Sequence, residues 1–338
     1  MFEKVNAGHP DKMADRLAGA VVDLVYERAG GLTKANPRVA CEVMAGHGRV
    51  DVQIETSLGR LDLRADDLDP LIHRLFGERV EGNVLIAPQD PHLSDNQTRG
   101  LRCGDNGIFK GCPPTEEQRV LTAIAATIYG SIPYDGKYII DSHEDVITEE
   151  PRRVNNEGTL TICQSHAIEG DIIQLLMEQE WCHGLYFDGK QDHLDFALNN
   201  PYTPYRLATY INPLGPWTGG IDVDCGCTNR KLGSDMGDGV TGGGLMGKDL
   251  SKADVSVNIV CHLLAVRYGT QIEACCSIGD EEVTFNGYYS IYAYERNLPK
   301  LPITMAFSDI VEQARLYIHT LGGFEKFAEW GLIRHCEK

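Results

Sequence analysis

The sequence lacks any long apolar run. None of its 338 residues belongs to an unbroken hydrophobic stretch near the roughly 20 residues that a membrane-spanning helix needs. The first residues also lack the basic segment followed by a long apolar one that marks a secretory signal. These absences argue against a membrane-spanning or membrane-bound protein, and we expect a soluble protein of the cytoplasm.

Positive charge is scarce. The chain has 31 Lys and Arg against 49 Asp and Glu, which gives a formal net charge of −18. A general nucleic-acid-binding protein, or one that coats anionic membranes, needs a broad basic surface. We therefore expect neither nucleic acid nor membrane as a partner, and an anionic ligand would have to meet a local group of cations.

Paired metal-binding cysteines are missing. Eleven cysteines are scattered along the chain, and neither Cys225 with Cys227 nor Cys275 with Cys276 has the C-x-x-C spacing of a structural zinc site. An odd number of cysteines without such a framework indicates free thiols in a reducing compartment rather than disulfides.

Two familiar phosphate-binding signatures are absent too. Gly247 and Lys248 are followed by Asp249, whereas a Walker A loop needs Ser or Thr at that position. No strand-turn-helix pattern surrounds a G-x-G-x-x-G sequence, which the dinucleotide fingerprint requires. Any phosphate site in this chain must therefore have a different form.

Periodic apolar residues predict an α+β protein. Val50, Val52 and Ile54 alternate after a Gly-His-Gly turn and predict a hairpin. Hairpins outnumber β-α-β crossovers, which favours α+β layers over a doubly wound sheet. We expect strands at 38–45, 49–56, 83–89, 138–141, 159–164, 206–211, 271–278 and 288–294. We expect helices at 13–25, 69–76 (with Pro70 in its first turn), 116–128, 171–179, 251–266 (capped by Ser251) and 308–320, with irregular chain at 92–114 and 212–249. A capping box at Thr115–Gln118 begins the helix at 116–128, and Val120, Ile124 and Ile128 form its core stripe. Val266 belongs to the core stripe of the helix at 251–266.

The segment NAGHPDKMADRLAGAVVDLV, residues 6–25, begins its helix in an unusual way. Pro10 suits the first helical turn, so His9 and Asp11 fall at the positive end of the helix. An anion can lie on the free N–H groups there, and Asp11 can hold a divalent cation that bridges to it. The alternative is an ordinary Asp cap with an incidental His.

A second candidate site lies in residues 219–256, where ten glycines fall between Gly219 and Gly247. Such a segment is costly to order unless its backbone needs positive φ or close contact with a ligand. It also contains four cations that a folded loop could aim at one polyphosphate: Arg230, Lys231, Lys248 and Lys252. The alternative is a surface loop with solvated charges.

Together these segments resemble the S-adenosylmethionine synthetases, also called methionine adenosyltransferases. The motifs GHPDK, RVACE, GDNG, DVDCGCTNRK and GKDLSKAD occur in the family's order across nearly the whole chain. The resemblance implies a short, divergent member built of three similar α+β subdomains, each a mixed or antiparallel sheet with helices packed on one face. We place these interleaved parts approximately at 1–97, 98–212 and 213–338. A homodimer with active sites at the subunit interface is also implied, with a tetramer as a further assembly.

The resemblance also implies a reaction. The sulfur of methionine attacks the ribose C5′ of ATP and expels triphosphate, which is then hydrolysed to phosphate and pyrophosphate. A thioether sulfur carries no proton, so the attack needs no general base. Catalysis must then come from positioning and from stabilising the leaving triphosphate.

Site residues follow from the resemblance by position. Those on the triphosphate are His9, Lys137, Arg230, Lys231 and Lys248. Those around methionine and the nucleoside are Glu55, Gln89, Asp105, Asp135, Trp217, Asp224 and Lys252. Asp11 and Asp254 would hold Mg²⁺, with two ions per site, and Glu42 corresponds to a family ligand of K⁺.

Several of these residues have a plainer alternative. Asp135 with Gly136 can form a β-turn next to Lys137. Glu55 can be an ordinary solvent-facing carboxylate, and Trp217 can belong to the core or to a lid.

Departures from the family pattern leave other functions open. Ala7 and His92 stand where the family usually has acidic residues, and Thr241 replaces a His before the triple glycine. The stretch GGGLMGKD is also one residue short, which weakens the case for K⁺. The alternatives to an active adenosyltransferase are a non-catalytic paralogue with a binding or regulatory role and a variant that keeps only the triphosphatase reaction.

Overall fold

The computed structural model describes residues 1–59, 62–92, 100–146, 154–187, 189, 192–196 and 205–334. The chain divides into two compact units. Unit 1 consists of Met1–His9, Pro114–Asp224 and Ile333–Lys338, and unit 2 consists of Pro10–Pro113 and Cys225–Leu332. Each unit therefore takes residues from distant parts of the sequence.

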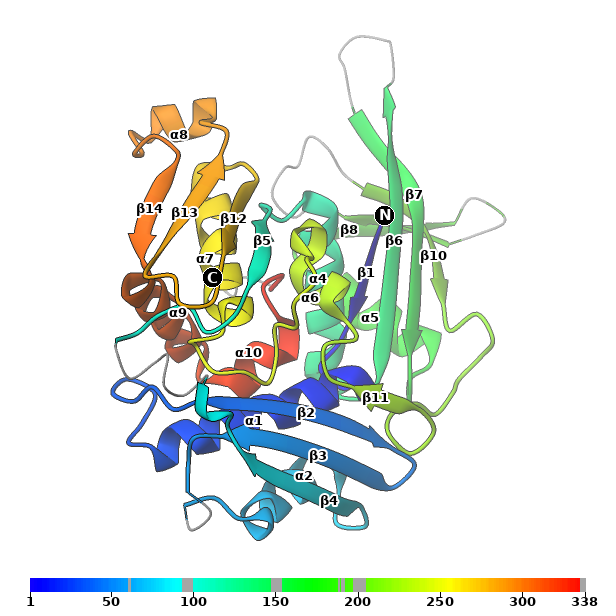
Figure 1. The fold of residues 1–338 in the computed structure, drawn as a ribbon. Coiled ribbons are helices and arrows are strands. Elements are labelled where there is room, and N and C mark those ends of the chain that lie inside the picture. Colours follow the sequence, from blue (N-terminus) through cyan, green and yellow to red (C-terminus); the bar gives the residue numbers. More distant parts are fainter. Residues whose placement is uncertain are drawn as a thin grey trace. The chain divides into compact units, whose positions relative to one another are not determined.

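Unit 1 is built on a six-stranded mixed sheet, sheet A (Figure 1). In spatial order its strands are β1 (Phe2–Val5), β6 (Gly136–Val146), β7 (Val154–Gln164), β10 (Tyr205–Ile211), β9 (Asp192–Phe196) and β8 (Cys182–Phe187). β1 runs antiparallel to β6, with Val5 opposite Lys137, whereas β10 runs parallel to β7. The first strand of the chain thus joins a sheet formed by the middle of the chain.

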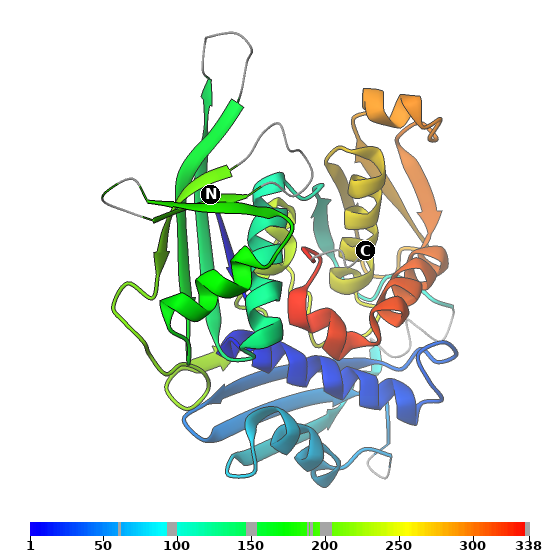
Figure 2. The same ribbon diagram turned by 180° about the vertical axis from the view of Figure 1, so that it is seen from behind.

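Two helices of unit 1 lie on sheet A (Figure 2): α4 (Glu116–Ser131) and α5 (Glu169–Met177). α4 begins with a capping box, in which Thr115 Oγ1 accepts from the N–H of Gln118 and the Gln118 side chain accepts from the N–H of Thr115. Val120, Ile124 and Ile128 are fully buried along α4 and form the core stripe that the sequence predicts.

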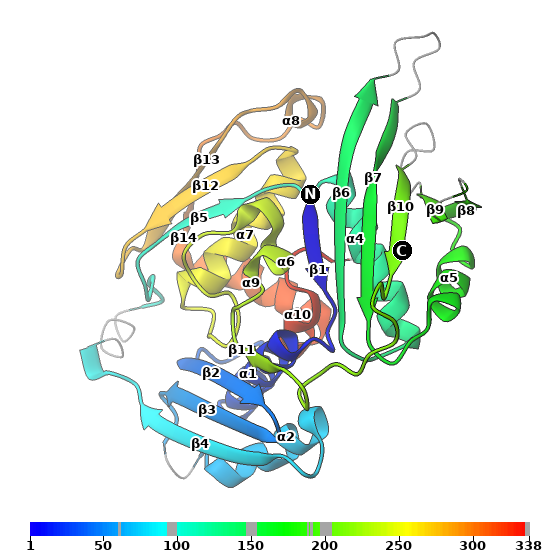
Figure 3. The ribbon, with the colours of Figure 1, turned by 90° about the vertical axis from the view of Figure 1, so that its right-hand side faces the viewer.

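Unit 2 contains two four-stranded sheets. Sheet B has the order β11 (Cys225–Cys227), β2 (Val39–Gly46), β3 (Arg49–Thr56) and β4 (Glu81–Pro88). One face buries alternate residues such as Val50, Val52 and Ile54. The helices α1 (Pro10–Arg28) and α2 (Asp69–Phe76) lie beside this sheet in Figure 3. α10 (Phe324–Trp330) packs on α1, where Gly19 lies against the carbonyl of Phe324.

Sheet C is antiparallel, with the order β14 (Ile303–Ala306), β13 (Glu282–Gly287), β12 (Ile272–Cys276) and β5 (Gly107–Gly111). α7 (Ala253–Tyr268) packs on β5 and β12, and α9 (Phe307–Leu321) packs on α7. Two short helices are α6 (Leu232–Met236) and α8 (Ile291–Glu295), and 3₁₀ turns span Ala65–Leu68 and Gly237–Gly239. α7 is buried on nearly every side, so its mostly apolar sequence suits its position.

The α+β class is confirmed, with one strand wrongly assigned. Residues 288–294 were expected as a strand, but the strand of this region is β13, at 282–287. Ser290 instead begins α8, because its Oγ accepts from the N–H of Ala293.

Three further expectations were wrong in whole or in part. The segment 92–114 was expected to be irregular, yet it contributes β5, which pairs with β12. α7 was expected to be capped by Ser251, but Lys252 occupies the N-cap position without a side-chain hydrogen bond. The N–H of Ser251 donates to Asp249 Oδ1 at 2.8 Å. Val266, expected in the core stripe of this helix, is exposed.

The described residues thus form three sheets with helices packed beside them. Where three similar parts would begin and end, at 1–97, 98–212 and 213–338, stays a prediction. No helix within the described ranges is both long enough and apolar enough to cross a bilayer.

Candidate functional site

Asp11, at the start of α1 in unit 2, faces several donors. Its Oδ1 accepts from the N–H of Cys227 at 2.9 Å and lies 3.4 Å from Arg230 Nε. Its Oδ2 lies 3.8 Å from Lys231 Nζ. The Asp11 side chain is only 1% exposed, and a carboxylate so deeply buried needs these partners to offset the loss of water.

Gly226 explains why α1 can begin at this place. A Cβ on Gly226, in the middle of β11, would overlap with the carbonyl of Pro10. The missing side chain lets the first turn of α1 lie directly on β11. This close approach brings the segment after β11, which carries Arg230 and Lys231, to Asp11.

A second glycine-rich segment follows the same edge of β2. The N–H of Cys41 donates to the carbonyl of Gly247 at 2.7 Å, and Ala40 pairs with Lys248 in an isolated bridge. Gly247 has a φ of +79°, which glycine adopts without strain. β11 pairs with the other end of β2, so both cation-bearing segments lie along one strand.

Lys248 and Asp254 form an ion pair at the start of α7. Lys248 Nζ lies 2.6 Å from Asp254 Oδ2, and the two side chains are 18% and 9% exposed. A Cβ on Gly243 would overlap with the Asp254 carboxylate. The glycine-rich backbone therefore passes directly against the first turn of α7.

Asn229 joins the two segments. Its Oδ1 accepts from the N–H of Met246 at 2.8 Å, and its Nδ2 donates to the carbonyl of Met246 at 3.2 Å. Contacts thus run without a break from α1 to α7. We name the five charged residues along them the charged cluster: Asp11, Arg230, Lys231, Lys248 and Asp254.

A fully buried ion triad supports the charged cluster. Lys12 Nζ lies 2.6 Å from Asp235 Oδ1 and 3.1 Å from Asp15 Oδ2. Burial would lower the pKa of Lys12, but the two carboxylates raise it above its ordinary value. Burial raises the pKa of Asp15 to about 7, although the positive charge of Lys12 acts to lower it. Asp15 Oδ1 also accepts from the N–H of Asn229 at 2.8 Å, so the triad fixes the loop that carries Arg230.

In unit 1, the loop that leads to His9 is tied to the start of β6. Asn6 Nδ2 donates to the carbonyl of Tyr134 at 2.9 Å, and Asn6 Oδ1 accepts from the N–H of Gly8 at 3.0 Å. The N–H of His9 donates to the carbonyl of Asn6 at 3.1 Å. Asn6 therefore places the His9 loop beside the turn that precedes Asp135.

Asp135 and Trp217 come together in unit 1. The N–H of Gly220 donates to Asp135 Oδ2 at 2.9 Å. A Cβ on Gly219 would overlap with both the Trp217 ring and the Asp135 carboxylate. Trp217 Nε1 donates to Asn212 Oδ1 at 3.1 Å. The two expected nucleoside residues are thus neighbours, and Asp135 also anchors the glycine-rich chain.

Lys137, in β6, makes an ion pair with Glu3 of β1. Lys137 Nζ lies 2.8 Å from Glu3 Oε2, and the side chains are 40% and 39% exposed. Exposed pairs of this kind contribute about 0–1 kcal/mol. The bond to Glu3 is therefore weak enough for Lys137 to exchange it for an anionic ligand.

Glu42 and Glu55 lie on the exposed face of sheet B, in β2 and β3. The strand register makes them diagonal neighbours. Thr228 Oγ1 donates a short hydrogen bond to Glu42 Oε2. Glu55 is solvent-facing in this chain, which is also the plain alternative that the sequence allows.

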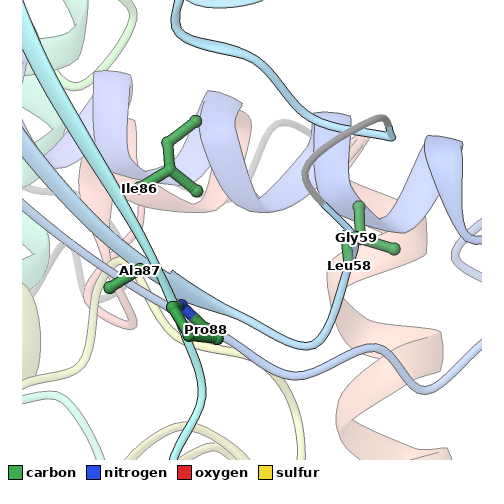
Figure 4. A pocket seen from close by; sticks show the side chains of 5 residues that line it. All are labelled: Leu58, Gly59, Ile86, Ala87 and Pro88. Carbon is green, nitrogen blue, oxygen red and sulfur yellow. The ribbon is translucent and has the colours of Figure 1, made fainter.

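A small apolar hollow lies near the ends of β3 and β4. Its volume of about 220 Å³ is below the roughly 300–1,000 Å³ of typical small-molecule pockets. Figure 4 shows the residues that line it: Leu58, Gly59, Ile86, Ala87 and Pro88. Gln89 follows directly, and within the described part of the chain its buried Oε1 has no hydrogen-bond partner. The same holds for Thr241 Oγ1 and Asn258 Oδ1.

The remaining expected residues lie in loops or at a helix end. The Sγ of Cys103 donates to the carbonyl of Asp105 at 2.9 Å. Lys252 is the N-cap residue of α7. Asp224 is exposed, and its N–H donates to the carbonyl of Gly220 at 3.1 Å. Their roles toward a substrate stay predictions.

Comparison with known proteins gives a consistent result, although no family profile matches the chain. The S-adenosylmethionine synthase of Oleidesulfovibrio alaskensis is 27% identical over 82% of this chain and 77% of that protein. The S-adenosylmethionine synthase of Novosphingobium aromaticivorans is 25% identical over 95% of this chain and 85% of that protein. The fold is similar to that of an unusual S-adenosylmethionine synthetase from Campylobacter jejuni, with a TM-score of 0.65 and 19% identity over 98% and 94% of the two chains. Over most of its length the chain is therefore similar in sequence to S-adenosylmethionine synthases, at 25–27% identity, and it shares the fold of a synthetase of that name.

Divalent-cation binding at the charged cluster would depend on single carboxylates. The described residues contain no group of three or more His, Cys, Asp or Glu that could hold a metal ion. Mg²⁺ usually takes one or two carboxylates and completes its shell with water and substrate phosphates. Asp11 and Asp254 therefore fit a cation that arrives with a polyphosphate, rather than one that the protein holds alone.

The residues that hold the charged cluster in place were missed at the sequence level: Lys12, Asp15, Asn229 and Asp235. Asn6, which holds the His9 loop in unit 1, was missed as well. Lys12 could have been found, because a lysine in the first turn of an apolar, buried helix needs an acidic partner. Its partner Asp235 lies 223 residues away, and nothing in the local sequence marks it.

Proposed function

We propose that this protein transfers the adenosyl group of ATP to L-methionine, releases triphosphate and hydrolyses it to phosphate and pyrophosphate. The observation that carries the proposal is the charged cluster. Three cations and two buried carboxylates gather at the first turns of two helices, where free N–H groups and helix dipoles favour an anion. The names of the relatives support the reaction class.

In this proposal Arg230, Lys231 and Lys248 bind the oxygens of the triphosphate. Lys248 is held 2.6 Å from Asp254 before a ligand binds, and Arg230 and Lys231 lie 3.4 Å and 3.8 Å from Asp11. Preorganised charge stabilises a leaving group without the cost of reorganisation during the reaction. Because the methionine sulfur needs no general base, this stabilisation together with positioning is the main contribution of the protein.

Asp11 and Asp254 are the residues that would hold Mg²⁺. When bound, such a cation neutralises charge that develops on the departing triphosphate. The carboxylates suit this role because both are nearly buried and already oriented, Asp11 by the N–H of Cys227 and Asp254 by Lys248.

Unit 1 supplies the residues that we assign to the nucleoside and the breaking bond. The contact network around Asp135 and Trp217 supports a nucleoside role, with the indole ring as a stacking surface. His9 and Lys137 would contact the triphosphate.

Methionine would be held by Glu55 and Asp224 at its ammonium group and by Gln89 and Lys252 at the rest of the amino acid. Among the described residues the buried Oε1 of Gln89 has no hydrogen-bond partner, which supports this assignment, because a buried acceptor without a donor is costly unless a ligand supplies one. Asp105 belongs to the loop expected to cover the site.

A homodimer, with a tetramer as a further assembly, completes the proposal. Met44 and Leu85 are each 59% exposed on the face of sheet B that also carries Glu42 and Glu55. Exposed apolar residues on a sheet face are typical of an interface. Glu42 is the residue that we assign to K⁺.

The test is mass-spectrometric detection of S-adenosylmethionine from purified protein, ATP, Mg²⁺ and methionine, with and without K⁺. Asp11→Asn should abolish the product. Asp309→Asn is the matched control, because Asp309 is an exposed acid in the first turn of α9, and it should keep the activity.

Three other outcomes would decide against parts of the proposal. Triphosphate hydrolysis without S-adenosylmethionine would favour the triphosphatase-only variant. ATP binding without either product would favour a non-catalytic paralogue with a binding or regulatory role. Full activity of Asp11→Asn would remove the charged cluster from the mechanism.

A further inference from the structure

Two buried cysteine side chains of unit 2, Cys103 and Cys276, lie close together beside strands β5 and β12 of sheet C. The Sγ atoms of Cys103 and Cys276 lie 3.2 Å apart. Cys103 precedes β5, Cys276 ends β12, and the two residues are 0% and 7% exposed. The two strands are adjacent, with Cys276 opposite Gly107, so the backbone holds the thiols together.

The separation is close to that of a disulfide. An S–S bond is about 2.05 Å long, so the two sulfurs need to approach by only about 1 Å, which side-chain rotation can supply. Hydrogen bonds fix the Cys103 backbone on both sides, because its N–H donates to the carbonyl of Asp280 at 2.9 Å and its carbonyl accepts from Gly279 at 2.7 Å.

The Cys103 segment is linked to two expected site regions. Its Sγ donates to the carbonyl of Asp105, and the N–H of Gly104 donates to the carbonyl of Ser251 at 3.0 Å. Ser251 belongs to the GKDLSKAD segment, which contains Lys248 and Asp254. Oxidation would remove the S–H donor from Asp105 and alter this linked loop.

We propose that Cys103 and Cys276 form a reversible disulfide when a hydroperoxide oxidises the protein. The peroxide oxidises one thiol to a sulfenic acid and is itself reduced, losing one water from H₂O₂. The second thiol then attacks the sulfenic sulfur, the S–S bond forms and a second water leaves. In total, two thiols lose two protons and two electrons, and a dithiol reductant reverses the change.

The effect on activity rests on the proposed function. Loss of the Cys103 hydrogen bond to Asp105 should lower adenosyl transfer about fivefold, the factor expected for one hydrogen bond. Dithiothreitol should restore it.

The experiment treats the full-length protein with hydrogen peroxide, blocks the remaining thiols and maps tryptic peptides by mass spectrometry. We expect a cross-link between peptide 103–110 and peptide 268–296, with the loss of two hydrogen atoms. Peptide 268–296 also contains Cys275, so the Cys275→Ser variant assigns the bond. This variant should keep the cross-link, whereas Cys276→Ser should lose both the cross-link and the peroxide sensitivity of turnover.

The readouts separate the two proposals. A cross-link in a protein that makes no S-adenosylmethionine would count against the proposed function and leave the disulfide established. Absence of the cross-link in wild-type protein, at a peroxide concentration that oxidises the exposed Cys275, would overturn the disulfide whatever the activity.

Discussion

Asp11 and Asp254 each contribute to the fold and to the candidate site. Asp11 accepts a hydrogen bond from β11 and faces two cations, and Asp254 pairs with Lys248 at the start of α7. Breaking a buried charge pair leaves the remaining charge without compensation. Substitutions in the charged cluster should therefore affect stability as well as turnover, and each needs an exposed residue as a control.

Lys248→Ala should lower turnover by roughly 100-fold or more, because the proposed function assigns this cation to the leaving triphosphate. S-adenosylmethionine formation at saturating substrates is the measurement. Lys300→Ala, at an exposed lysine of the same unit, is the control and should behave like wild type. Near-normal turnover of Lys248→Ala would exclude this lysine from the mechanism.

His262, in α7, should make stability depend on pH. Burial lowers the pKa of His262 from 6.5 to about 4. Between these values the unfolded chain binds a proton that the folded chain does not. The free energy of unfolding therefore falls by up to about 3 kcal/mol as pH drops through this range. Above this range, His262 causes no further change in the free energy of unfolding.

The His262→Leu variant should remove this pH dependence. The measurement is the free energy of urea unfolding at about pH 7, above the expected transition, and at about pH 4.5, near its lower end. His319→Gln, at an exposed histidine of α9, should keep the wild-type difference. An unchanged difference in His262→Leu would show that other groups cause it.

At the scale of elements, glycines decide how closely the parts of unit 2 approach. Gly226 lets α1 lie on β11, Gly247 lets its segment lie on β2, and Gly243 lets the chain pass against α7. None of these contacts leaves room for a Cβ. The glycine-rich composition of residues 219–247 therefore reflects packing as well as turns.

Gly226→Ala should destabilise unit 2 by roughly 1–3 kcal/mol or more, the usual cost of overpacking. It should also weaken ATP binding, because α1 and the Arg230 loop would be pushed apart. Urea unfolding and nucleotide titration are the measurements. Gly233→Ala, where a Cβ meets nothing within 4 Å, is the control. Equal behaviour of the two variants would contradict this account of α1 packing.

At the scale of the whole molecule, the exposed face of sheet B should govern assembly. Met44→Lys places a charge in an apolar patch, which should convert the proposed homodimer into monomers because burying an unpaired charge is costly. Light scattering after size-exclusion chromatography measures the mass. Leu316→Lys, at a 62% exposed residue of α9, should leave the assembly unchanged. A Met44→Lys variant that keeps the wild-type mass would place any interface elsewhere.

Local patterns were enough to predict many elements. α2 begins at Asp69 with Pro70 in its first turn and ends at Phe76, as expected, and α4 begins at the predicted capping box. These features depend on residues within a few positions of each other. The expectation of a strand at 288–294 was wrong because Ser290 caps α8 and its Oγ also donates to the carbonyl of Tyr268 at 2.6 Å.

The sequence by itself determined the α+β class and the resemblance to S-adenosylmethionine synthases, and it named the candidate cations, because ordered motifs and charge scarcity are local or compositional properties. Only the tertiary structure decided which charges meet. Lys12 reaches Asp235 across 223 residues and Cys103 reaches Cys276 across 173. Such contacts depend on how glycines let β11, β2 and the helices approach, and neither spacing nor composition encodes that approach.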